Sequence, residues 1–302
     1  MLQKLFSCYN NNGDIMNKYK ILEAEKDFIF RHHNVSNTKG SRNKRIIIDK
    51  KYGTNGFFKY EKYECSEACS EKLAYEIAKV LKMESAKIEF AKDENGTLGI
   101  ISYIFINDNI THTDAKDFFN ASQFDRKNFC TIKSIKQFLD LFGKDEFKKF
   151  VGIMIFDALI GEQDRHEENW GLIKENNIYR LSPLYDSSCN LLRDFKKQEN
   201  AEKIYNGIID FNKFILRSQT CIYKDNLKSR YKHFELIEYV YKKYPKIVKE
   251  ELKKIRRLTN EKIKNIVDKL PNGIITEMHK EYICKYLIKR KTILLNYLKK
   301  GE

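Results

Sequence analysis

The residues best suited to chemistry in this chain lie between positions 164 and 186. Asp164 is followed five residues later by Asn169, and a second carboxylate, Asp186, comes after a predicted hairpin. One aspartate can orient a hydroxyl group and accept its proton, while an asparagine and a second aspartate can hold magnesium on phosphate groups. Mg²⁺ favours such a sparse set of oxygen ligands, completed by the phosphates of a substrate. The order of these residues therefore predicts phosphoryl transfer to a hydroxyl group.

The segments on either side of Asp164 are predicted to form a helix and a hairpin. Residues 171–174 and 178–181 flank Glu175-Asn176-Asn177 and predict two short antiparallel strands. The start of the first strand then lies beside the end of the second, which brings Asn169 and Asp186 together near Asp164. Before Asp164, apolar residues at intervals of three and four predict a helix that ends near Gly161: Phe147, Phe150, Val151, Met154, Ala158 and Leu159.

Each of these residues also has a purely structural interpretation. Asp164 could cap a turn, His166 could satisfy its hydrogen bonds locally, and Asp186 could begin a loop. The occurrence of the whole set in this order, within a helix, loop and hairpin, favours the chemical interpretation.

The same residues carry a resemblance to a known family. Asp164-Arg165-His166, Asn169-Trp170-Gly171 and Leu181-Ser182-Pro183-Leu184-Tyr185-Asp186 resemble the signature of HipA-like serine/threonine kinases, bacterial kinases related to persistence toxins. The resemblance implies an α+β, two-lobed protein-kinase-like fold, with a small β-rich N-lobe and a larger helical C-lobe. The chain is similar to compact members that lack an extra N-terminal subdomain. ATP, Mg²⁺ and a protein serine or threonine are the implied donor, cofactor and acceptor, with Asp164, Asn169 and Asp186 as catalytic residues and Asn169 and Asp186 as metal ligands.

The N-terminal part of the chain has the element order of such a small lobe. Residues 44–49 and 56–60 predict strands, residues 66–81 a helix with Ser66 as its N-cap, and residues 88–90 and 99–105 further strands. Lys59, in the second strand, is expected to contact the nucleotide phosphates. Glu71, or Glu76 as the competing choice, is expected to hold its ammonium group. The alternative is that these are ordinary surface charges.

A phosphate loop, and a hinge between the lobes near Ser102, Tyr103 and Ile104, complete the expected nucleotide site. Residues 36–44 resemble the family's phosphate loop in Gly40 and Lys44, but Arg42 replaces its glutamine and Asn43 lies one position away. Glycine lets backbone N–H groups approach a phosphate, although an ordinary basic turn remains the alternative. His166 is expected to brace the catalytic loop rather than to titrate. The residues assigned to nucleotide binding are Gly40, Ser41, Arg42, Asn43, Lys44, Lys59, Glu71, Ser102, Tyr103, Ile104, His166 and Tyr185.

The resemblance also implies autophosphorylation in the phosphate loop. Ser36, Thr38 and Ser41 are the candidate acceptors. A phosphate placed there would pair with the neighbouring basic side chains and compete with the nucleotide.

Length and composition fit one two-lobed domain. A chain of 302 residues with 42% hydrophobic content can bury a core of that size. We expect a disordered leader at residues 1–16, with Met16 as an alternative start, an N-lobe at 17–105 and a C-lobe at 106–302. Seven cysteines without a C-x-x-C pair favour a reducing, cytoplasmic setting, with export or translocation into a host cell as the alternative. The sequence contains no run of 18 apolar residues, so no transmembrane span is predicted.

Positive charge is concentrated in the last third of the chain. From residue 191 onward there are 28 Lys and Arg against 14 Asp and Glu, so this part carries nearly all of the net charge of +15. It is either a solvated helical surface or a binding surface for nucleic acid, an acidic protein or an anionic membrane. An antitoxin or host protein is the implied partner. Two other functions stay open, a catalytically inactive binding module and a small-molecule kinase, since a fold does not fix the acceptor.

Overall fold

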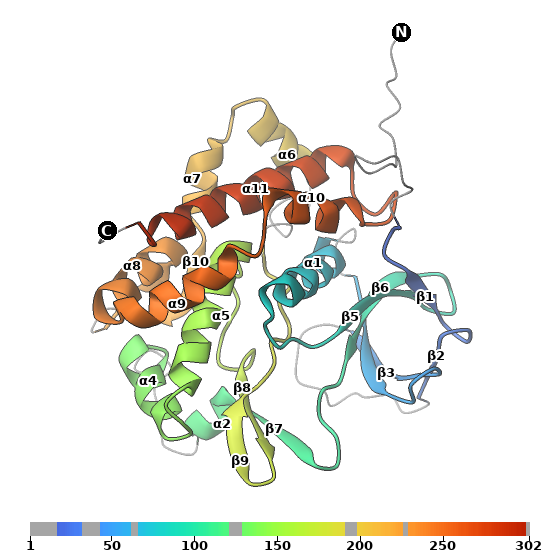
Figure 1. The fold of residues 1–302 in the computed structure, drawn as a ribbon. Helices are drawn as coiled ribbons and strands as arrows, with labels where there is room; N and C mark the ends of the chain where they lie inside the picture. The colour runs from blue at the N-terminus through green and yellow to red at the C-terminus, as the bar shows by residue number, and fades with distance from the viewer. Residues whose placement is uncertain are drawn as a thin grey trace.

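The structure is a computed structural model that describes residues 17–31, 43–61, 66–120, 129–190, 198–225 and 229–299. The predicted leader and residues 36–42 of the predicted phosphate loop lie outside these ranges. Figure 1 shows a curled sheet on one side of the molecule and a group of helices on the other, with α1 (Ser66–Leu81) between the sheet and the C-terminal helices.

The sheet has six strands in the order β1-β5-β6-β4-β3-β2. Its strands are β1 (Ile21–Glu23), β2 (Phe28–Phe30), β3 (Lys44–Asp49), β4 (Asn55–Tyr60), β5 (Ile88–Lys92) and β6 (Leu98–Tyr103). All neighbours are antiparallel except β1 and β5, which are parallel. The sequence predicted the four longer strands but not β1 and β2, which have three residues each. Phe28, Ile47 and Phe58 form the centre of a small core inside the curled sheet.

Helix α1 packs on β5 and has the bounds that the sequence predicts. Leu73, Ile77 and Leu81 are buried, as expected from their spacing. The Glu61 carboxylate accepts the N–H groups of Glu67 and Ala68, which satisfies donors that a helix leaves open in its first turn.

The other part of the molecule is mainly helical. Its helices are α2 (Ala115–Asn120), α4 (Ile132–Asp140), α5 (Glu146–Ile160), α6 (Gln198–Tyr205), α7 (Phe211–Leu216), α8 (His233–Lys243), α9 (Pro245–Ile255), α10 (Asn260–Asp268) and α11 (Glu277–Asn296). Helix α5 is buried on every side from Phe150 to Ile160, which marks it as the central helix. None of the helices in the described ranges is long and apolar enough to cross a lipid bilayer.

Two small sheets accompany these helices. Strand β7 (Ile110–Asp114) pairs with β8 (Gly171–Glu175), which forms the predicted hairpin with β9 (Ile178–Leu181). Strands β10 (Gln219–Tyr223) and β11 (Arg230–Lys232) form a second, two-stranded sheet. The sequence analysis did not predict β7, β10 or β11. Strand β6 ends at Tyr103 and β7 begins at Ile110, so the predicted lobe boundary at residue 105 falls between them.

Hydrogen bonds join the two parts of the molecule at several places. Leu184 donates to the carbonyl of Glu84 at 2.9 Å and accepts from Ala86 at 2.8 Å. The Arg257 guanidinium donates to the carbonyl of Leu81 at the end of α1, at 3.0 Å. The Tyr19 N–H, just before β1, donates to the carbonyl of Lys269 at 2.8 Å. Helix α1 is therefore held from both lobes.

Candidate active site

The catalytic loop predicted at Asp164 lies between the central helix and the β8–β9 hairpin. Helix α5 ends at Gly161, whose φ of 77° is a left-handed conformation that glycine adopts without strain. In the hairpin Leu172 lies opposite Leu181, and the N–H of Ser182 donates to the carbonyl of Gly171 at 2.9 Å. The loop and the segment that follows β9 therefore emerge at the same end of the hairpin, as expected.

The residues predicted to hold the nucleotide phosphates and the metal come together around one ammonium group. Lys59 Nζ lies 2.9 Å from Glu71 Oε2 and 3.2 Å from Asp186 Oδ1. The side chain of Lys59 is 12% exposed and that of Glu71 is 1% exposed, whereas Asp186 is 42% exposed. Lys59 thus joins the sheet, helix α1 and the segment after β9, and it leaves the Asp186 carboxylate open to solvent.

The structure distinguishes between the two glutamates that could partner Lys59. Glu71 makes the contact, while Glu76 pairs with Lys72 at 2.9 Å and with Lys79 at 3.2 Å. Lys72 is itself buried and also contacts Glu89 at 2.8 Å. Because Glu71 and Glu76 are five residues apart on the helix, their side chains point in different directions and contact different neighbours.

Asn169 is oriented by the catalytic loop. Its side-chain nitrogen donates to the carbonyl of Asp164 at 2.6 Å and lies 3.3 Å from His166 Nε2. The other ring nitrogen of His166 accepts the N–H of Glu168 at 3.1 Å. Because the amide nitrogen faces the loop, the amide oxygen of Asn169 is the atom available to a metal. His166 lies inside the loop, where it can brace these residues.

Asp186 has a left-handed backbone with φ of 50°. Aspartate is among the few residues other than glycine that adopt this region readily. The turn directs the Asp186 carboxylate toward Lys59, and the next residue, Ser187, toward the buried side of the segment.

A buried arginine that the sequence analysis did not assign connects the loop after α5 to the segment that carries Asp186. Arg165 contacts both carboxylate oxygens of Asp157, at 3.3 and 3.2 Å. It also donates to the carbonyls of Asn169 at 3.0 Å and Tyr185 at 2.7 Å, and to the Ser187 hydroxyl at 2.7 Å. Burial raises the pKa of Asp157, and the charge of Arg165 acts in the opposite direction. An aspartate within the otherwise apolar residues 150–160 of this helix, eight residues before an arginine, was the signal available in the sequence.

Tyr185 was assigned to nucleotide binding, and its side chain lies against strand β7. Its hydroxyl lies 2.9 Å from Asp114 Oδ1 and 3.2 Å from the carbonyl oxygen of Glu168, the two acceptors within reach of its single proton. The ring lies 5.2 Å from that of His112. Burial and the Asp114 carboxylate raise the pKa of Tyr185, so the hydroxyl stays a neutral donor. This side chain ties β7 to the catalytic loop, and its contact with a nucleotide stays a prediction.

The remaining nucleotide assignments are placed only in part. Lys44 lies directly opposite Lys59 in the β3–β4 register, and burial followed by the charge of Lys59 lowers its pKa. Two cations side by side favour an anionic ligand. Gly40, Ser41 and Arg42 lie outside the described residues, whereas Asn43 is the residue before β3.

Two backbone N–H groups of the expected hinge already donate hydrogen bonds within the protein. The N–H of Tyr103 donates to the carbonyl of Lys87 at 2.9 Å, and the N–H of Ile104 donates to that of Asn55 at 3.0 Å. Ser102 lies in β6, between β4 and β5. Adenine recognition at this hinge would therefore depend on carbonyl groups or on residues after Ile104.

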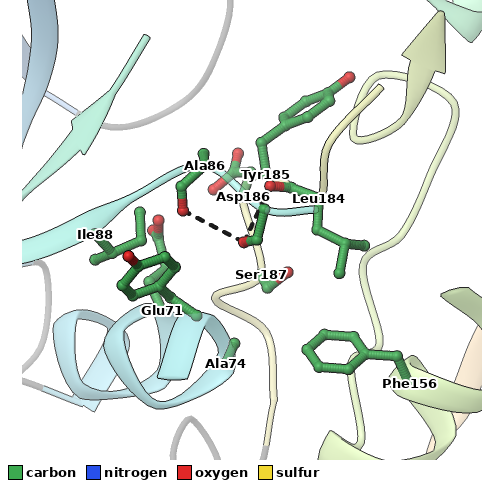
Figure 2. Close-up of a pocket in the computed structure, with 11 residues that line it drawn as sticks. Glu71, Ala74, Ala86, Ile88, Phe156, Leu184, Tyr185, Asp186 and Ser187 are labelled. Atoms are coloured by element: carbon green, nitrogen blue, oxygen red, sulfur yellow. Dashed lines mark hydrogen bonds between the residues drawn. The ribbon is translucent and has the colours of Figure 1, made fainter. Parts of the chain in front are cut away.

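A pocket lies behind the Lys59 contacts. Figure 2 shows Glu71 and Ala74 of α1, Ala86 and Ile88 near the start of β5, and residues 184–187 around it. Phe156 of the central helix closes one side. The pocket separates α1 from the segment that carries Asp186, so the position of Glu71 relative to Asp186 depends on the residues that line it.

Comparison with known proteins defines the family. The family model of the HipA-like C-terminal domain matches residues 35–258 of the sequence, and the chain belongs to this family. It is 26% identical over 150 residues to the serine/threonine-protein kinase CtkA of Helicobacter pylori, a match that spans 49% of this chain and 44% of that protein. The chain thus aligns with less than half of the length of this curated relative.

Solved structures show the same fold. The crystal structure of the Helicobacter pylori proinflammatory kinase CtkA matches with a TM-score of 0.76 and 18% identity, over 92% of this chain and 96% of that one. HipA of Shewanella oneidensis, from a complex with HipB and operator DNA, matches with a TM-score of 0.53 and 12% identity, over 89% of this chain and 68% of that one. The predicted two-lobed, kinase-like α+β fold is confirmed.

The Arg165–Asp157 pair generates a prediction about stability. Arg165→Met should lower the free energy of unfolding by about 3–5 kcal/mol, because it leaves a buried carboxylate without its partner. Combining it with Asp157→Asn should restore part of that loss. Denaturant unfolding of the two single variants and the double variant measures the coupling. Losses that simply add would contradict the interaction.

Proposed function

We propose that this protein is a serine/threonine protein kinase that uses ATP and Mg²⁺ and phosphorylates itself. The observation that carries the proposal is the position of Lys59, within 2.9 Å of Glu71 and 3.2 Å of Asp186, at the end of the hairpin that also presents Asn169. Membership in the HipA-like family and the match to a serine/threonine kinase support the same conclusion.

The residues fit the chemistry of a magnesium-assisted transfer. The amide oxygen of Asn169 and the exposed carboxylate of Asp186 are hard oxygen ligands of the kind Mg²⁺ prefers. When bound there, the metal would neutralise charge on the phosphates. Lys59 and Lys44 would contact phosphate oxygens from the sheet.

Asp164 would act on the acceptor. Its carboxylate side chain is 49% exposed, so a serine or threonine hydroxyl can approach it. Asp164 would orient this hydroxyl and accept its proton as the oxygen bonds to the γ-phosphorus and ADP leaves. The products are a phosphoprotein, ADP and a proton.

Activity should depend on the two aspartates in different ways. Asp164→Ala and Asp186→Ala should each lower phosphoryl transfer by roughly 10³-fold or more, and only the second should also weaken Mg·ATP binding. Labelled ATP incubated with a lysate measures transfer, and calorimetry measures binding. Asp140→Ala, which removes an exposed carboxylate on α4, is the matched control.

The acceptor is read from the same incubation. Label on proteins supports the proposal, whereas label on metabolites would identify a small-molecule kinase. Wild-type turnover in Asp164→Ala would show that the catalytic assignment is wrong, and absence of any transfer would favour an inactive binding module.

Autophosphorylation is expected on Ser36, Thr38 or Ser41. A doubly charged phosphate beside Lys39, Arg42 and Lys44 should pair with them and lower the affinity for ATP. Mass spectrometry of protein made with ATP, compared with Asp164→Ala, locates the modification. An active enzyme with an unmodified loop would remove this part of the proposal.

A macromolecular partner is a second candidate role for the C-terminal helices. Val248, Leu252 and Ile255 of α9 are buried, while Lys253 and Arg256 are exposed. Not all of the charge is available, because Lys280, Arg290 and Lys291 are interior. One relative, a HipA protein, was crystallised with HipB and operator DNA, and an antitoxin, a host protein or a nucleic acid is the corresponding proposal here. A cytoplasmic location, or delivery into a host cell, is proposed with it.

Reversal of charge on α9 tests this role. If α9 binds a polyanion, DNA or RNA affinity should fall steeply as salt rises from about 50 to 200 mM, because bound cations are released. Lys249→Glu, Lys253→Glu and Arg256→Glu together should weaken binding and leave activity on a small peptide unchanged. The same reversal of Lys262 and Lys264 on α10 and of Lys269 at its C-cap controls for net charge. Loss of activity on one acidic protein only would identify a protein partner, and no effect would identify a solvated surface.

A further inference from the structure

A buried glutamate lies between the two segments that carry the candidate catalytic residues. Glu162 is 1% exposed. Its Oε1 accepts the N–H of Asp164 at 2.9 Å, and its Oε2 accepts the N–H of Cys189 at 3.1 Å. Asp164 belongs to the loop after α5, and Cys189 follows Asp186 by three residues. One carboxylate therefore holds the main chain of both segments.

Further contacts close the same junction. The N–H of Gln163 donates to the carbonyl of Cys189 at 2.9 Å. The Cys189 thiol lies 3.5 Å from Asp164 Oδ2, within the reach of a weak S–H donor. The position of the Asp164 carboxylate is thus tied to the segment of Asp186 through Glu162 and Cys189.

The C-terminal helices hold the main chain of Glu162. Its carbonyl lies 2.7 Å from His233 Nε2 on α8, and His233 Nδ1 lies 3.0 Å from the Ser218 hydroxyl. Burial, with a contribution from Arg290, lowers the pKa of His233 to about 3, so the ring is neutral and one nitrogen donates to Glu162. Arg290 of α11 donates to the Ser218 hydroxyl at 2.9 Å and to the carbonyl of Ala158 at 2.6 Å. Glu162 is therefore anchored from α8 and α11.

We propose that Glu162 is a positioning residue, which fixes Asp164 relative to the segment that carries Asp186 by accepting one main-chain N–H from each. The proposal rests on the proposed function. The Glu162 carboxylate accepts from Asp164 and Cys189, whereas the groups assigned to the phosphates and the metal are Lys59, Glu71 and Asp186. Loss of Glu162 should therefore lower kcat and leave KM for ATP nearly unchanged.

Replacement by glutamine separates this role from packing. Glu162→Gln keeps the size of the side chain but turns an NH₂ group toward one of the two N–H donors, so only one hydrogen bond survives. Glu162→Asp keeps the charge but is one methylene too short to span both donors. Glu146→Gln is the matched control, because Glu146 is also buried and accepts a main-chain N–H, that of Leu181, at 2.6 Å.

The ionisation of Glu162 determines the pH at which the variants should be compared, and it makes the pH dependence of kcat a second measurement. Burial raises its pKa to about 8, and Arg165, Asp157 and Asp164 are the charged groups that face it. At a pH of about 9 the carboxylate is present. As the pH falls below about 8, wild-type Glu162 becomes protonated and resembles glutamine, so the ratio of wild-type to Glu162→Gln kcat should shrink.

Kinetics and hydrogen exchange on the full chain test the proposal. At a pH of about 9, Glu162→Gln should lower kcat by roughly 10- to 100-fold with KM for ATP within about threefold, while Glu146→Gln keeps kcat within about threefold. The amides of Asp164 and Cys189 should exchange faster in Glu162→Gln and Glu162→Asp, but not in Glu146→Gln. Unchanged exchange, or equal losses of kcat in Glu162→Gln and Glu146→Gln, would overturn it. If the wild-type protein transfers no phosphoryl group and the exchange pattern still holds, the proposed function fails and the positioning role stands.

Discussion

The ammonium group of Lys59 makes the interaction on which the arrangement of the candidate site depends. It is nearly buried, and a buried cation needs close anionic partners to remain charged. Its two partners come from helix α1 and from the segment after the hairpin, which belong to different parts of the molecule. The contacts of Leu184 with residues 84–86, and of Arg257 with the end of α1, hold these parts at the spacing that the three groups require.

A second set of buried polar side chains holds the loop that carries Asp164. Arg165 joins Asp157 to the carbonyls of Asn169 and Tyr185, and Glu162 joins Asp164 to Cys189. Each of these buried polar groups finds several hydrogen-bond partners in the interior, which is the condition under which burial is tolerated. Such networks have few alternative arrangements, so they can fix the loop more closely than apolar contacts alone.

The basic character of the C-terminal third has two physical origins. Some of its cations are exposed on α9 and α10, where solvent screens them, and those of α9 are the ones proposed to meet a polyanion. Others are interior: Arg290 is fully buried and donates to the carbonyls of Ala158 and Ile215. A net charge counted from the sequence therefore overstates the charge of the surface. Some of the cations, such as Arg290, are buried and hold the helix that precedes Asp164.

The sequence by itself determined the elements whose signals are local. Apolar spacing gave the bounds of α1 and the end of α5 at Gly161, and the turn at residues 175–177 gave the hairpin that brings Asn169 near Asp186. The motifs around Asp164, Asn169 and Asp186 predicted the family and its fold, and the comparisons confirm both. Only the tertiary structure decided that Glu71 rather than Glu76 meets Lys59, that β7 joins the hairpin, and that Glu162 and Arg165 lie inside the junction of the two segments. These outcomes depend on contacts between residues far apart in the chain and on burial, and neither leaves a periodic pattern in the sequence.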